Sequence, residues 1–218
     1  MKFRLEMLVP KFPFAISHKD SLFLIGSCFT ENMGEKLRQA LFTTTENPHG
    51  ILFNPYSVHK ALSDYIHKNR YTEDHLFYHG EAWHSWHHHS RFSAATPEES
   101  VERINTAIAH AHERLLHSKY LIITLGSAWV YSLTKEATVT PNTTIVANNH
   151  KAPAQWFTKK LMESEEIVVL YQKLFRELQA INPTLQIILT VSPVRHLREG
   201  TVMNNLSKAH LLAAVHKL

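Results

Sequence analysis

The sequence lacks the features that mark several large classes of protein. Its 218 residues include a single cysteine, Cys28, which excludes an intrachain disulfide framework and is typical of a reducing compartment. No apolar run approaches the roughly 18 residues of a transmembrane helix, and no signal-peptide-like stretch follows the first basic residues. The 23 Lys and Arg against 19 Asp and Glu give a formal charge of +4 and form no basic block. We therefore expect a cytoplasmic protein with no membrane and no nucleic-acid partner, while the oligomeric state stays open.

The composition is that of a globular chain. Hydrophobic residues make up 44% of the sequence and charged residues only 19%. The length suffices for one substantial core, so a single domain over residues 1–218 is the expected organisation. The 17 histidines are the unusual feature, and with reference pKa values near 6.5 they make the chain much more cationic at about pH 5.

Short apolar runs alternate with amphipathic helical patterns along the chain. The pattern predicts strands at 22–25, near 42–46, at 120–125 and at 185–191, and helices at 30–41, 56–69, 97–118, 163–181 and 204–218. Residues 132–160, with prolines and several asparagines, are predicted to be loop. Near-continuous apolar strands between helices indicate an α/β fold, a three-layer sandwich around a parallel sheet. We expect Leu24, Ile123 and Ile188 at mid-strand to be fully buried.

The segment 71–93 is rich in aromatic residues and histidines without a clean period. We expect it to form an excursion or small hairpin on the core. Its histidines at 84 and 87–89 suggest a metal site, but cysteine and carboxylate partners are lacking, so packing is the preferred interpretation. We predict no metal and no organic cofactor.

Small polar residues follow the three clearest strands. In a parallel sheet these carboxyl ends share one edge, where ligands bind. Ser27 also begins a helix, whose free N–H groups favour negative charge. It is therefore either a turn residue or a nucleophile, for which its own N–H, Gly50, Gly126 and Ser127 are candidate oxyanion or substrate contacts. We expect its neighbour Cys28 to be a buried structural residue. The three strand ends are Gly26-Ser27, Gly126-Ser127 and Ser192-Pro193.

Five stretches resemble, in chain order, the blocks of the GSCFA family, which is related to the SGNH (GDSL-like) hydrolases. They are "IGSCFTENMG", with Thr30 where the family's name has alanine, "HGILFNPYSV", "TLGSAWVY", "NNHKAP" and "SPVRHLREG". The resemblance implies a flavodoxin-like α/β fold and a serine esterase, acyl-group hydrolase or acyltransferase. It matches Ser27 to the nucleophile, Gly50 to the oxyanion glycine of the second block and Gly126 to the glycine of the third block. The implied substrate is a small-molecule or carbohydrate ester.

The chain departs from the SGNH pattern at the third block. The superfamily has Gly-x-Asn-Asp there, with the asparagine donating to the oxyanion, whereas this chain has Gly126-Ser127-Ala128-Trp129. Asn54 or Asn149 are possible replacements from loops.

The expected acid and base form a second departure. The superfamily closes with Asp-x-x-His near the C-terminus, but the last aspartate here is Asp74, and we expect no such pair after Ser27. His150 and His196 are the histidines expected to border the edge, and His150 is a candidate substrate contact. Because a helical pattern runs to the last residue, we expect the C-terminal part of the fold, with the acid and base, to lie beyond this chain. The competing interpretation is a non-catalytic ligand- or carbohydrate-binding domain that keeps the fold.

Overall fold

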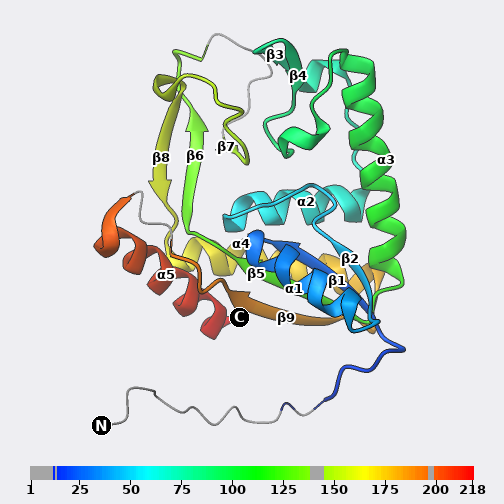
Figure 1. Cartoon of the computed structure of the whole chain (residues 1–218). Helices are drawn as coiled ribbons and strands as arrows, with labels where there is room; N and C mark the ends of the chain where they lie inside the picture. The colour runs from blue at the N-terminus through cyan, green and yellow to red at the C-terminus, as the bar shows by residue number, and fades with distance from the viewer. Residues whose placement is uncertain (1–11, 13, 138–144, 196–198) are drawn as a thin grey trace.

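The computed structural model describes residues 12, 14–137, 145–195 and 199–218. Its centre is a four-stranded sheet in the order β2-β1-β5-β9, and all three neighbouring pairs are parallel. The strands are β1 (Ser21–Gly26), β2 (Thr43–Glu46), β5 (Tyr120–Leu125) and β9 (Gln186–Val191). Figure 1 shows this sheet in the lower half of the molecule.

Helices flank both faces of the sheet. They are α1 (Cys28–Gln39), α2 (Pro55–His67), α3 (Pro97–Leu116), α4 (Ser164–Ile181) and α5 (Gly200–Lys217). Side chains alternate along a strand, so β1 sends Phe23 and Ile25 into the large core with α2, α3 and α4, and Leu22 and Leu24 to the face that α1 covers. The expected α/β fold with a central parallel sheet is thus confirmed. None of the described helices is long and apolar enough to cross a membrane.

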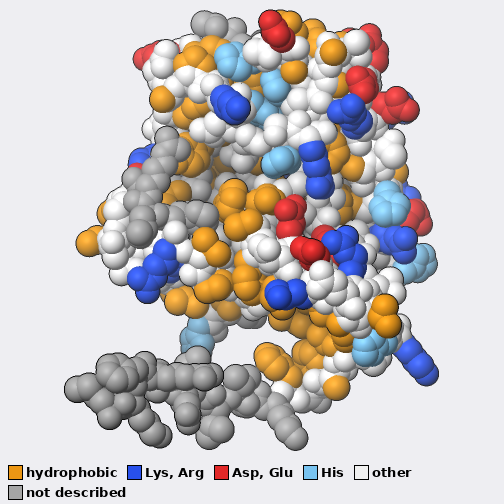
Figure 2. Space-filling model, viewed as in Figure 1, with side chains coloured by type: hydrophobic (Ala, Val, Ile, Leu, Met, Phe, Trp, Pro, Cys, Tyr) orange, Lys and Arg blue, Asp and Glu red, His pale blue; other side chains and the backbone are white. Residues whose placement is uncertain are grey.

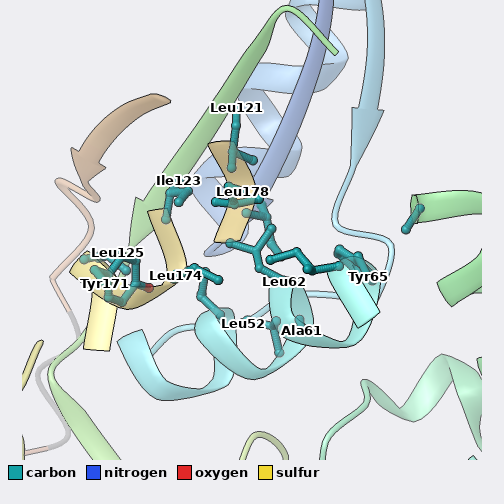
Figure 3. Packing of buried hydrophobic residues seen from close by; sticks show 14 of the residues in the cluster. Leu52, Ala61, Leu62, Tyr65, Leu121, Ile123, Leu125, Tyr171, Leu174 and Leu178 are labelled. Carbon is teal, nitrogen blue, oxygen red and sulfur yellow. The ribbon is translucent and has the colours of Figure 1, made fainter. Parts of the chain in front are cut away.

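The main core lies between β5 and the helices α2 and α4. Figure 3 shows Leu121, Ile123 and Leu125 of β5 facing Leu174 of α4 and Leu62 of α2. All five side chains are fully buried. This packing fixes the strand ends, and therefore the edge that carries the polar residues.

Predicted helix starts and strand positions hold where local signals are strong. Thr96 is the N-cap of α3 and its hydroxyl accepts from the Glu99 N–H, as the Thr-Pro-x-Glu pattern predicts. Leu24 and Ile123 are fully buried. The predicted full burial of Ile188 is wrong: it is only partly buried, because β9 is the edge strand of the described sheet.

A second layer of short strands lies above the core, and we call it the aromatic layer (residues 71–94, 129–137 and 145–161). The segment 71–93 contains the predicted hairpin, β3 (Phe77–His79) with β4 (Ala82–His84). The prediction of loop over 132–160 is wrong, because β6 (Trp129–Leu133) pairs antiparallel with β7 (Ile145–Val146) and β8 (Phe157–Leu161). Figure 1 shows β6 and β8 standing beside the end of α2. The asparagines and prolines of this segment favour loop in a sequence-based prediction, so these strands were not predicted.

Candidate functional site

Ser27 and Gly126 lie at the point where the strand order of the sheet reverses. Ser27 follows β1 and is the N-cap of α1, and Gly126 follows the neighbouring strand β5. The chain passes from β1 to β2 on one side of β1, and then crosses to β5 on the other side. In open parallel sheets such a reversal leaves a crevice at the carboxyl ends, which is where ligands bind. The predicted polar edge is therefore present in the fold.

The side chain of Ser27 is completely buried, with 0% exposure. Its hydroxyl does not cap α1, and the Oγ has no hydrogen-bond partner among the described residues. Its N–H donates to the Thr124 carbonyl oxygen at 3.2 Å. A Cβ placed on Gly126 would lie 3.2 Å from the Ser27 Cβ and 3.1 Å from the Phe53 ring, so these three residues touch.

Gly50 lies on the same edge, after β2. Its φ of +88° is unfavourable for other residues, and a Cβ there would lie 2.1 Å from the Cβ of His89. Its N–H donates to the Asn47 carbonyl oxygen at 2.7 Å. Both N–H groups suggested for an oxyanion, those of Ser27 and Gly50, thus bond to carbonyls in this structure.

A cavity of about 520 Å³ lies between the edge of the sheet, the aromatic layer and α5. It is lined by Ile51, Phe53, Asn54, His89, Gly126, Ser127, Trp129, Tyr131, Val146, Ala147, Asn148, Asn149, Glu199, Asn204 and Ser207. The expected residues Asn54, Gly126 and Ser127 are among them, but Ser27, Gly50 and His150 are not. Among the described lining residues the one carboxylate, that of Glu199, is paired with Lys159, so this lining combines aromatic rings with neutral amides and hydroxyls.

Several lining groups already have structural partners. The Asn54 Oδ1 accepts from the Ser57 N–H at 2.8 Å and caps α2. The N–H groups of Gly126 and Ser127 both donate to the Phe53 carbonyl oxygen, at 2.8 and 2.9 Å. The Ser127 hydroxyl lies 3.3 Å from that of Ser207 on α5. These bonds fix the cavity wall and leave these N–H groups occupied.

Lys208 on α5 connects two of the predicted strand ends, a role that the sequence pattern did not reveal. Its ammonium donates to the carbonyl oxygens of Gly126 and Ser192, at 2.6 and 2.7 Å. Burial lowers the pKa of Lys208, and the nearby Cys28 opposes this shift. The expectation that Cys28 is buried is wrong, since it is partly exposed and borders a second, charged groove beside α1.

His150 belongs to the interior of the aromatic layer. Its Nε2 is hydrogen-bonded to the Ser85 carbonyl oxygen at 2.8 Å, and its ring packs on Phe77 and His84. Burial lowers the pKa of His150 to about 4, so the imidazole is neutral at pH 7. None of the hydrogen bonds in the described part of the chain joins a histidine to Ser27, and His196 lies outside the described residues.

The expectation that no Asp-x-x-His follows Ser27 is wrong, because Asp64 and His67 form one on α2, before the later blocks. Asp64 is fully buried and accepts from Lys60, Asn69 and Tyr71. Burial opposes its ionisation, but His49 and Lys60 outweigh this effect and hold the pKa of Asp64 below its usual range. Its partners tie α2 to the start of the aromatic layer.

The histidines of that pair and of the aromatic layer make structural contacts. Half-exposed His67 pairs with Glu177 on α4, so Asp64 and His67 do not act on each other. The two ring nitrogens of His84 are hydrogen-bonded to the Ser93 hydroxyl and the His79 carbonyl. His88 stacks on His49, with ring centroids 4.2 Å apart. Across the described ranges, no group of three or more His, Cys, Asp or Glu side chains is arranged to hold a metal ion.

Some lining residues were missed by sequence reasoning, and one signal was available. Trp129 and Tyr131 flank buried Val130 on β6, and this period of two places both aromatics on the cavity face. Asn204 and Ser207 stand on α5 among similar polar residues, and no local pattern distinguishes them.

Taken together, the fold and the site define an α/β protein with a buried serine at the strand reversal of a parallel sheet, whose hydroxyl has no partner among the described residues. The chain belongs to the GSCFA family, whose pattern it matches over residues 21–218. No curated protein and no solved structure matches the chain.

Proposed function

We propose that the chain is an SGNH-like serine hydrolase domain, an esterase or acyl-group hydrolase or transferase, with Ser27 as the nucleophile. The observation that carries the proposal is the Ser27 Oγ: buried, at the start of a helix, and without a hydrogen-bond partner among the described residues. The large majority of buried side-chain hydroxyls have a partner, and a catalytic role is one of the explanations for an exception. The strand order 2-1-3-4, counting parallel strands along the chain, agrees with a flavodoxin-like sheet and supports the same relationship.

In this reaction the Ser27 Oγ attacks the carbonyl carbon of an ester, the alcohol leaves, and the acyl group passes to water or to another acceptor. The cavity next to Gly126 holds the substrate. Because the Phe53 ring lines this cavity and also touches Gly126 beside Ser27, its movement opens the way to the hydroxyl. A serine hydroxyl needs a base within hydrogen-bond reach to become a strong nucleophile. Among the described residues, no such base is hydrogen-bonded to the Ser27 Oγ.

A serine-reactive fluorophosphonate probe tests the proposal. We expect the purified chain to gain the mass of one phosphonyl group, and the Ser27→Ala variant to gain none. A matched control is Ser63→Ala, which removes a serine on α2 that is not part of the cavity. Labelling that persists in Ser27→Ala, or no labelling of the purified chain, contradicts the proposal.

A second function, binding of a neutral ligand such as a carbohydrate without catalysis, is favoured by one observation. Ser27 does not line the cavity, whereas Trp129, Tyr131 and several amides do. Titration with simple sugars, followed by the fluorescence of the four tryptophans, separates the two. Saturable binding without labelling of Ser27 supports the binding domain.

A further inference from the structure

The proposed reaction needs a group that stabilises negative charge on a substrate at Ser27. Attack by the Ser27 Oγ places charge on the former carbonyl oxygen, and preformed donors must stabilise it. The backbone N–H groups of Ser27, Gly50, Gly126 and Ser127 all bond to carbonyl oxygens. A different donor is therefore needed on this edge.

We propose that the side-chain amide of Asn47 is this donor, an inference that rests on the proposed function of Ser27. Asn47 directly follows β2 and is completely buried. Its Oδ1 accepts from the Gly26 N–H at 2.8 Å, one residue before Ser27. A backbone N–H can only donate, so the atom it bonds is the amide oxygen, and the NH₂ group is the one left over. That Nδ2 has no partner among the described residues.

The backbone around Asn47 holds this amide in place. Its N–H donates to the Leu24 carbonyl at 2.9 Å, and its own carbonyl accepts from the Gly50 N–H and from Arg91. These bonds connect Asn47 to β1, to the following loop and to the aromatic layer. An oxyanion donor is effective when its orientation is fixed before the reaction, and these contacts fix it.

Another unpaired group near Ser27 is less suited to the role. Thr30, in the first turn of α1, has a buried Oγ1 without a partner in the described part of the chain. A hydroxyl rotates freely about its C–O bond, whereas the Asn47 amide is held by its oxygen. A buried NH₂ group without a partner is uncommon in native proteins, and a ligand oxygen would satisfy it.

The test is the rate of phosphonylation of Ser27 by the same fluorophosphonate. The Ser27 Oγ–P bond forms, the P–F bond breaks, fluoride leaves with the electron pair and the serine proton passes to a base or to buffer. The phosphoryl oxygen takes the oxyanion position. Asn47→Asp keeps an oxygen for the Gly26 N–H and removes the NH₂ donor. We expect labelling at neutral pH about 100-fold slower than wild type, or slower still.

Asn32→Asp is the matched control. It makes the same change on α1, where the exposed Asn32 amide donates to the Cys28 carbonyl, and it should label as the wild type does. Toward acid pH the introduced carboxyl gains a proton and can donate again, so the deficit of Asn47→Asp, relative to wild type at each pH, should shrink. Protonation also removes the structural cost of a buried carboxylate, so the free energy of unfolding of Asn47→Asp is measured over the same pH range. A labelling rate that recovers only in step with this stability contradicts the inference.

The outcomes separate the two proposals. Equal labelling rates for folded Asn47→Asp and wild type overturn the inference while Ser27 keeps its role. No Ser27-dependent labelling of the wild type overturns both. If Asn47→Asp fails to fold, the side-chain ¹⁵N–¹H₂ signals of Asn47 in the wild type decide. Phosphonylation of Ser27 should shift these signals strongly, and unchanged signals contradict the inference.

Discussion

The core and the aromatic layer of this protein are stabilised by different chemistry. The core between β5, α2 and α4 consists mainly of fully buried aliphatic side chains, together with the buried Tyr65 and Tyr171. In the aromatic layer, histidine rings form part of the packing. His88 stacks on His49, which lies just outside the layer, and His150 packs on His84. Figure 2 shows histidine side chains in the upper half of the viewed face and others at its right and lower edges. Apolar burial does not depend on pH, whereas buried imidazoles must stay neutral.

The difference matters for the cavity, because the two regions each supply part of its wall. Gly126 and Asn54 come from the core edge, and Trp129 and Tyr131 from the layer. The N–H groups of Ala147 and Asn148 donate to the Trp86 carbonyl, so the cavity wall depends on the packing of the layer. Four predictions sharpen this comparison, in order of the decreasing effect expected from a single side chain.

The largest effect is expected where a buried charge joins the two regions. Asp64→Asn removes a fully buried carboxylate that accepts from Lys60 and Tyr71 and leaves the Lys60 ammonium without its buried partner. We expect a loss of about 3–5 kcal/mol in the free energy of unfolding, measured by urea denaturation. Exposed Asp74 supplies the control, Asp74→Asn, which should change little. Similar small losses in both variants would show that Asp64 is not the anchor.

A purely apolar truncation in the sheet should cost somewhat less. Leu24 is 1% exposed, and Leu24→Ala removes its packing and leaves a cavity. The expected loss is about 2–5 kcal/mol, independent of pH between 5 and 8. The 82% exposed Leu41 gives the control Leu41→Ala, which should stay near wild type.

Acid should destabilise the aromatic layer before the core. Burial lowers the pKa values of His87 and His150 to about 4, from about 6.5 in an unfolded chain. The unfolded state therefore binds more protons between pH 6.5 and 4, so stability is full above pH 6.5 and falls as pH drops to 4. Each group accounts for roughly 3 kcal/mol over that range.

Two optical signals distinguish the regions in this titration. All four tryptophans lie in the aromatic layer, while the long helices belong to the core. Tryptophan fluorescence should change at a higher pH than far-UV circular dichroism. His150→Gln should make stability less dependent on pH, and His216→Gln, on an exposed position of α5, should not. Coincident transitions that no histidine variant moves would argue against the titrating layer.

The smallest effect on stability is expected at Ser27. Its hydroxyl makes no hydrogen bond with the described residues, so Ser27→Ala should leave the free energy of unfolding within about 1 kcal/mol of wild type. If urea denaturation shows Ser27→Ala to be as damaging as Leu24→Ala, Ser27 is structural and the nucleophile hypothesis fails.

The sequence alone determined the elements whose signals are local. The apolar run of β5 and the Thr96 cap of α3 were predicted at the correct residues, because hydrophobic periodicity and capping depend on neighbours in the chain. The parallel sheet, and with it the shared edge of Ser27, Gly50 and Gly126, follows from the order of those elements.

Tertiary structure alone decided which polar groups are used and which are left over. The strands β6 and β8 pair across residues whose composition indicates loop, because the partner strand and not the local sequence stabilises them. From the sequence alone, Asn47 before Pro48 is typical of a turn. In the folded chain its Oδ1 accepts a hydrogen bond from the Gly26 N–H, and its Nδ2 has no partner among the described residues. The sequence cannot show this, because packing decides which groups far apart in the chain form hydrogen bonds.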